Sequence, residues 1–232
     1  MRGAVLIALL ASACAHESVR GSGHVVRDLR DLPPFESVAV RSGIHATVEI
    51  GPQAPVQVDA DDNVLPLVVT EVIDNTLEIR FLQGAWVRSE EPVRVKVRVP
   101  WLRSLTASGG ADLRAEVDPG DELDIHSSGG AEVRVRGVHA ARLSVEGSGG
   151  SRVHISGAVD RMKLRLSGGS RLRAASLSAR AVNVQGSGGA TAEIRATDEL
   201  RGSLSGGSSV RLLGRASSRV STSGGSSVDF DE

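Results

Sequence analysis

The chain has 232 residues, with 27 basic and 28 acidic side chains and a formal net charge of −1. This balance lacks the basic excess that nucleic-acid binding requires, so we expect no nucleic-acid partner. Only 2% of the residues are aromatic. The core must therefore consist mainly of Val, Leu, Ile and Ala, which suits a thin interior.

The first 13 residues have the pattern of a signal peptide. Arg2 supplies the positive start, residues 4–10 are apolar, and residues 11–13 are small, as a cleavage site requires. The apolar run is too short to span a bilayer. We therefore predict that the chain is exported.

Cys14, the only cysteine, follows this segment directly. The arrangement resembles a bacterial lipoprotein, in which cleavage exposes the cysteine for lipidation and several acyl chains give a stable anchor. Ala11 stands where Leu is commoner, and the alternative is an ordinary signal peptide that leaves a free thiol. Ala15 is not the Asp that commonly retains lipoproteins in the inner membrane, which favours the outer membrane, on its periplasmic or surface side. Residues 14–27 are polar and predict a flexible tether.

The remaining residues, 28–232, predict one β-helix domain. Apolar and polar residues alternate over residues 35–40, 46–50 and 93–99, as expected of half-buried strands. Shorter apolar segments at residues 56–58 and 77–79 lie between them. We expect this front half to form longer and less regular coils of the same kind as the back half.

Seven Ser-Gly-Gly triplets divide the back half at intervals of 18 to 20 residues. A fixed period in this range is typical of a solenoid. Glycine suits a tight corner because it accepts positive φ and has no Cβ to obstruct stacking. The triplets begin at Ser108, Ser128, Ser148, Ser167, Ser187, Ser205 and Ser223.

Each triplet lies between two alternating segments, so each coil reads as strand, corner, strand and a looser turn. The interval is too short for a helical crossover, which needs about 30 residues. We predict an all-β fold, a single-stranded parallel β-helix (β-solenoid) with coils of about 18–20 residues in the C-terminal half. Successive coils are expected about 4.8 Å apart.

Five sequence motifs resemble the auto-transporter adhesin head GIN domain family. They are FESV at 35–38, SGIH at 42–45, VDADDN at 58–63, NTLEI at 75–79 and VxVPxLxSL at 97–105. His45 departs from the family pattern, where Asn is expected. The resemblance covers residues 28 to about 230 and implies an exported β-helix, often lipid-anchored, without an established activity.

The sequence assigns no catalytic residue, metal site or cofactor. Its six histidines show no metal-ligand spacing, and there is no CxxC or HExxH motif. β-Helices also carry polysaccharide lyases and hydrolases, so an enzyme of that class is the alternative function. Such enzymes need concentrated carboxylates, and Trp86 and Trp101 are the only candidate sugar platforms.

The sixth residue after the Ser of each triplet gives the most promising candidate site. Stacking would align these outward residues in one ladder, which is mostly basic and is able to bind an anionic polymer such as lipopolysaccharide or an acidic glycan. A solvated face is the alternative. The ladder is Arg114, Arg134, His154, Arg173, Glu193, Arg211 and Asp229.

Together these features predict a cell-envelope lipoprotein with a structural or adhesin-like binding role and no catalytic activity. Its partners would be the membrane, through the lipid anchor, and an anionic glycan or an envelope protein. Three acidic side chains among the last four residues, Asp229, Asp231 and Glu232, would oppose end-to-end stacking of uncovered coils. We therefore expect a monomer.

Overall fold

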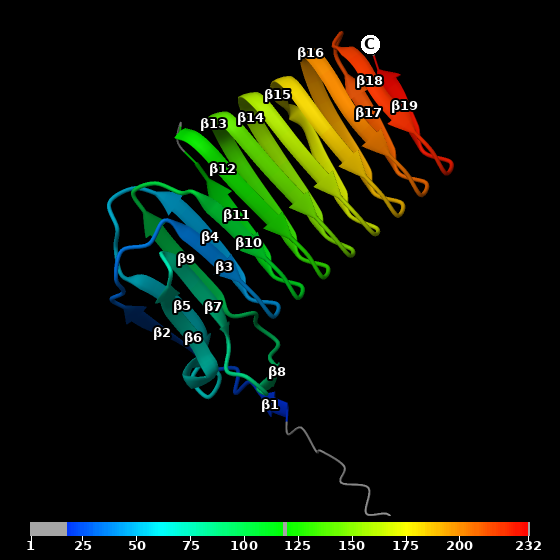
Figure 1. The fold of residues 1–232 in the computed structure, drawn as a ribbon. Coiled ribbons are helices and arrows are strands. Elements are labelled where there is room, and N and C mark those ends of the chain that lie inside the picture. Colours follow the sequence, from blue (N-terminus) through cyan, green and yellow to red (C-terminus); the bar gives the residue numbers. More distant parts are fainter. Residues whose placement is uncertain (1–17, 118–119, 232) are drawn as a thin grey trace, which may run out of the picture.

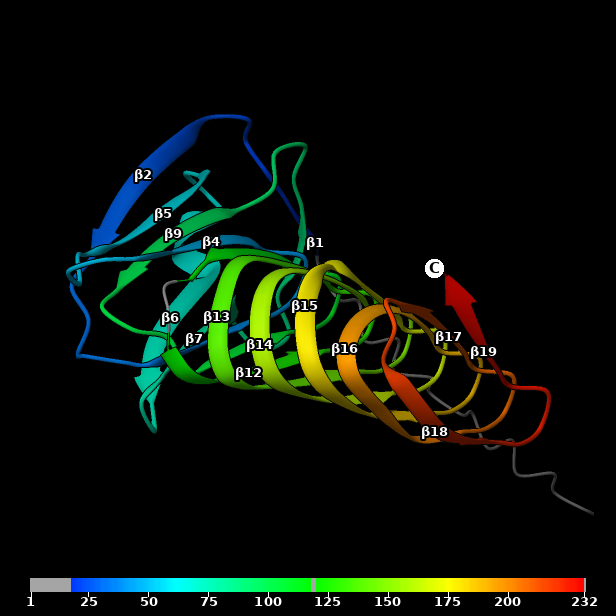
Figure 2. The same ribbon diagram turned by 90° about the horizontal axis from the view of Figure 1, so that it is seen from above.

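A narrow interior of aliphatic side chains, enclosed by stacked coils of strand, defines the computed structural model, which describes residues 18–117 and 120–231 (Figure 1). Seventeen strands form one continuous hydrogen-bonded sheet wrapped around this interior. Figure 2 looks obliquely along the stack and shows the coils from β12 to β19 enclosing a single core. The predicted all-β solenoid is confirmed.

Each coil contributes one strand before its corner and one after it. The strands before a corner are β3 (Ser37–Val40), β7 (Thr76–Phe81), β10 (Ser104–Ala107), β12 (Gly120–Ser127) and β18 (Ser217–Thr222). The strands after a corner are β4 (His45–Ile50), β11 (Asp112–Glu116), β17 (Ser209–Leu213) and β19 (Ser227–Asp231). Strand β9 (Arg94–Val99) pairs with β4 and extends this set. Four long strands serve both positions: β13 (Glu132–Gly147), β14 (Arg152–Leu166), β15 (Arg171–Gly186) and β16 (Thr191–Leu204). We call the outward surfaces of these two sets the pre-corner face and the post-corner face.

The Ser-Gly-Gly corners fix the register between coils. The first glycine of every triplet has φ between 59° and 66°, in the left-handed region that favours glycine. A Cβ on Gly149 would lie 3.2 Å from the backbone nitrogen of Gly129 in the preceding coil. Hydrogen bonds continue the stacking, as from the Ser148 N–H to the Ser127 carbonyl at 3.0 Å.

Interior residues next to the corners alternate in size from coil to coil. A Cβ on Gly147 would lie 2.7 Å from a methyl carbon of Leu166, and a Cβ on Gly186 would lie 2.7 Å from one of Leu204. These two glycines therefore make room for the leucines of the next coil. They serve core packing, since interiors are filled to high density.

The front half differs from the prediction of irregular coils. Strands β3 and β4 pair in parallel with β10 and β11 on one side and with β7 and β9 on the other, as coils do. Beyond them the pairing is antiparallel: β6 (Val68–Ile73) pairs with β7, and β5 (Val56–Asp61) joins β9 to β2 (Val25–Arg30). These strands, with the short 3-10 helix η1 (Leu65–Leu67), form a cap that covers the first edge of the solenoid.

Two strands lie within or overlap the segment predicted to be a tether. Strand β1 (Ser18–Arg20) pairs in parallel with β8 (Trp86–Arg88), and Val19 packs against the core. The prediction of a flexible tether over residues 14–27 is therefore wrong from residue 18 onward, because β1 and β2 find partners in the cap. The predicted signal peptide and Cys14 lie outside the described residues. No helix in the described part of the chain is long and apolar enough to cross a membrane.

The C-terminal coil ends the stack without a cap among the described residues. Val220 and Val228 are half-buried, and Phe230 is 62% exposed although it occupies an inward column. The last coil therefore leaves part of the interior open to solvent. The monomeric state stays a prediction, as does the repulsion by Asp229, Asp231 and Glu232 that would oppose end-to-end stacking. Glu232 lies outside the described residues.

Replacing a corner glycine should destabilise the whole stack. We expect Gly149→Val to cost roughly 1–3 kcal/mol of unfolding free energy, because the corner requires positive φ and lies against Gly129. Thermal unfolding followed by circular dichroism measures this. Arg161→Val is the matched control, since Arg161 is exposed and points outward; it should change stability by less than about 0.5 kcal/mol. Equal melting temperatures would contradict the role of the corner.

Candidate binding surface

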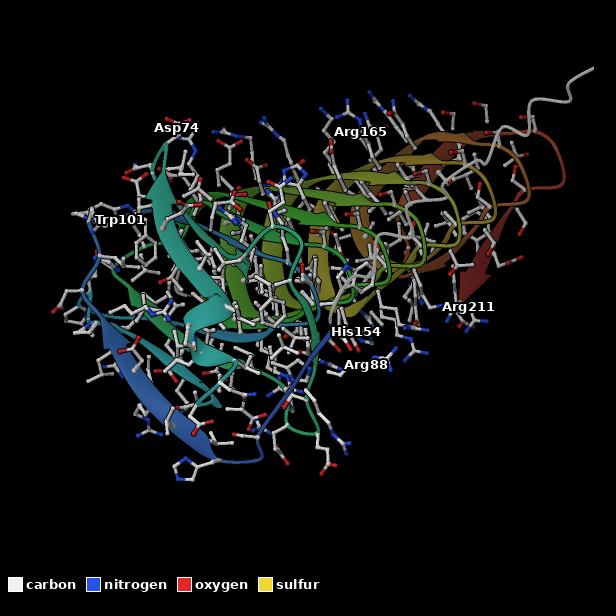
Figure 3. All side chains as sticks on the ribbon, turned by 90° about the horizontal axis from the view of Figure 1, so that it is seen from below. Asp74, Arg88, Trp101, His154, Arg165 and Arg211 are labelled. Atoms are coloured by element: carbon white, nitrogen blue, oxygen red, sulfur yellow. The ribbon has the colours of Figure 1, made fainter. Side chains whose placement is uncertain are left out.

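The predicted ladder forms one column on the post-corner face. The parallel register pairs Arg114 with Arg134, Arg134 with His154, and His154 with Arg173. The column continues through Glu193 and Arg211 to Asp229. Figure 3 shows His154 and Arg211 on one side of the solenoid and Arg165, a pre-corner residue, on the other.

The residue two positions before each ladder residue belongs to a neighbouring column on the same strands. In the first two coils this column holds the carboxylates Asp112 and Glu132, which neutralise the start of the ladder. Asp112 accepts hydrogen bonds from Arg114 at 3.2 Å and from Arg134 at 3.0 Å, and Arg134 also contacts Glu132. Burial raises the pKa of Asp112, but the hydrogen bonds from the two arginines outweigh it and hold that pKa below its ordinary value. Arg114 and Arg134 are therefore committed to ion pairs within the protein.

The next two coils are different, because both the ladder and its neighbouring column carry basic residues there. Arg152 pairs in register with Arg171, and His154 pairs in register with Arg173, so four basic side chains occupy a two-by-two array. We call Arg152, His154, Arg171 and Arg173 the basic patch. Its three arginines make no ion pair with any described residue, and the Arg171 Nε donates to the Thr191 hydroxyl at 3.3 Å.

The basic patch affects the ionisation of its histidine. Burial lowers the pKa of His154 below its ordinary value, and the positive charges of Arg173, Arg134 and Arg152 lower it further. Glu132, whose carboxylate lies 3.7 Å from Nε2 of His154, opposes this effect. His154 is therefore mainly neutral at pH 7 and gains its charge only in more acidic solution.

Toward the C-terminus the ladder becomes mixed in sign. Glu193 and Asp229 alternate with Arg211, whose Nε lies 3.9 Å from a carboxylate oxygen of Asp231. A shallow hollow of about 290 Å³ lies between these residues and the patch residues Arg171 and Arg173. The free positive charge of the column is thus confined to the middle coils.

The pre-corner face carries a second polar row, which the sequence reasoning did not identify as a unit. Glu146 lies 2.9 Å from Arg165 and 3.4 Å from His126, and the Arg165 Nε donates to Gln185 at 3.3 Å. The hydrogen bond from Arg165, with the charge of His126, lowers the pKa of Glu146. This row lines a groove of about 550 Å³ beside the corner serines. Its charges satisfy one another, so it attracts anions less than the basic patch does.

The described residues contain no group of three or more His, Cys, Asp and Glu side chains able to hold a metal ion. Asp61 is the one buried acid among them, and it accepts a hydrogen bond from the Ser89 hydroxyl. The acidic side chains on the two faces are instead spread among arginines as ion pairs. The arrangement suits recognition of a ligand by charge.

The fold and the charged faces define a capped, all-β solenoid. Residues 34–216 match the family model described as "Putative auto-transporter adhesin, head GIN domain". The match covers most of the chain, so this protein belongs to that family. No curated protein sequence matches the chain.

Solved structures share the same fold. A putative adhesin from Bacteroides fragilis superposes with a TM-score of 0.86 at 20% identity, over 92% of this chain and 100% of that one. A putative adhesin from Parabacteroides merdae gives 0.71 at 21% identity, over 93% and 99%. A protein described as a putative lipid binding protein from Parabacteroides distasonis gives 0.71 at 18% identity, over 93% and 100%.

Proposed function

We propose that this protein is an envelope lipoprotein whose solenoid binds an anionic polymer through the basic patch, without catalysis. The observation that carries the proposal is the two-by-two array of Arg152, His154, Arg171 and Arg173, whose arginines have no carboxylate partner among the described residues. Guanidinium groups pair well with carboxylate and phosphate oxygens. An acidic glycan and the phosphates of lipopolysaccharide both present such groups.

The spacing of the array supports a polymeric ligand. Adjacent coils of a parallel sheet lie about 4.8 Å apart, and alternate residues of a strand lie about 6.6 Å apart. Arginines on such a grid present several donors to successive charged groups of one extended chain. A polymer therefore gains by making several weak contacts at once.

The envelope location rests on the start of the chain and on the family. Residues 1–13 have the features of a signal peptide, and Cys14 follows them. The adhesin description of the family supports export to the cell envelope, and lipidation at Cys14 would hold the protein there, with the outer membrane favoured. The relatives named above are described as adhesins or as lipid binding, which supports a binding role over an enzymatic one.

Removing the basic patch should weaken binding to anionic polymers. We expect Arg152→Gln, Arg171→Gln and Arg173→Gln together to reduce affinity for polygalacturonate or purified lipopolysaccharide at least about tenfold, because charge-assisted contacts are lost. The reduction should shrink in high salt. Biolayer interferometry on the mature chain in detergent measures both effects.

A matched control changes the same net charge on the other face. Arg161, Lys163 and Arg219 point outward from the pre-corner face and form no ion pair with a described residue. Their replacement by Gln should alter affinity less than about twofold. Affinity of the wild type should also rise as the pH falls through the pKa of His154, which burial lowers below its ordinary value. Equal losses in the two triple variants would contradict a specific patch.

The anchor at Cys14 has its own test. Cys14→Ser removes the thiol that would carry the lipid, so we expect the protein to move from the membrane pellet to the soluble fraction after a salt wash. Mass spectrometry of the purified wild type should show the mass of the attached acyl chains. A Ser variant that stays in the washed membrane would contradict lipid anchoring.

A further inference from the structure

An exposed aromatic side chain lies on the two-stranded ribbon formed by β1 and β8. In the β1–β8 pair, Ser18 lies opposite Trp86 and Arg20 lies opposite Arg88. The middle residues Val19 and Val87 pack against the core. Because side chains alternate along a strand, the other face of the ribbon presents Trp86, Arg20 and Arg88 outward.

This ribbon face combines apolar and basic groups. Trp86 is 62% exposed, and Leu82, in the loop that precedes β8, is 46% exposed. Arg88 forms no ion pair with a described residue, and Arg20 lies 3.9 Å from Glu90 in a pair whose side chains are 86% and 93% exposed. Such exposed pairs are weak and open readily.

We propose that this ribbon face docks onto the surface of the bilayer that holds the lipid anchor. The inference rests on the proposed lipidation of Cys14. Only three residues lie between Cys14 and Ser18, and a fully extended chain covers at most about 14 Å over these four steps. Trp86, opposite Ser18, is therefore confined close to the lipid headgroups.

The side chains present there suit a membrane interface. Tryptophan is enriched at the level of the headgroups, where its ring meets apolar chains and its N–H meets polar groups. Arginines beside it can pair with lipid phosphates, and basic groups next to an anchor strengthen attachment to anionic lipids. Tethering raises the local concentration of the ribbon at the surface, so even weak contacts are populated.

Docking at the ribbon would also orient the solenoid. Strand β1 lies at the opposite end of the molecule from β19 (Figure 1). With the cap against the bilayer, the coils would extend away from the membrane. The basic patch on the middle coils would then remain accessible to a polymer.

The two tryptophans of the chain provide a matched test. Trp86 and Trp101 are the only two in the sequence and are equally exposed, at 62% and 61%. Trp101 lies well apart from Arg88 in Figure 3. In the full lipidated protein, Trp101→Phe leaves Trp86 as the single fluorophore, and Trp86→Phe leaves Trp101.

Each variant is reconstituted in vesicles of phosphatidylethanolamine and phosphatidylglycerol, with brominated lipids as quenchers. We expect Trp86 emission to shift to shorter wavelength and to lose about half its intensity, and Trp101 emission to stay unchanged, because only Trp86 reaches the interface. Adding Arg20→Gln and Arg88→Gln should reduce the quenching. Circular dichroism checks that the variants are folded.

The outcomes separate docking from anchoring. If the protein floats with the vesicles but Trp86 is no more quenched than Trp101, docking is overturned and the anchor stands. If the purified protein carries no lipid and remains soluble, the anchor fails and the docking that rests on it fails as well.

Discussion

Contact between successive corners is the constraint on which the rest of this structure depends. The first glycine of each triplet has positive φ, and a Cβ there would approach a backbone nitrogen of the preceding coil to 2.9–3.2 Å. Corners held this closely cannot slip by a residue without turning every interior side chain outward. The register in turn aligns outward residues in columns. Whether a charged residue is neutralised or left available then depends on its neighbours in the coils above and below.

The sequence predicted the parts of the fold that repeat. Constant spacing of the triplets and strict alternation indicated coils, corners and the ladder from Arg114 to Asp229, and the register pairs those residues as expected. The ladder residues that remain free of ion pairs were not predictable from one column. Arg134 is neutralised by Asp112, a residue 22 positions earlier, so only the registered structure separates paired from unpaired arginines. The cap was missed because its antiparallel strands have no period, and the tether was misjudged because short polar strands such as β1 depend on a distant partner.

The basic patch depends on the register between coils and not on individual arginines, so it should be possible to move the patch along the solenoid. Arg152→Gln with His154→Gln removes its N-terminal half. Thr191 and Glu193 lie in register with Arg171 and Arg173 one coil toward the C-terminus. Adding Thr191→Arg and Glu193→Arg therefore builds a two-by-two array of the same spacing, shifted by one coil.

The affinity of this relocated patch for polygalacturonate is the most direct test of the account. We predict that relocation restores affinity to at least about one third of the wild-type value, because the array keeps its spacing and gains an arginine in place of His154. A control adds the same charge at two exposed positions outside the strands, with Asp31→Arg and Gln83→Arg in the variant that lacks Arg152 and His154, so that no registered array forms. It should leave binding weak. Equal recovery in both variants, or recovery in neither, would contradict the claim that registered columns create the site.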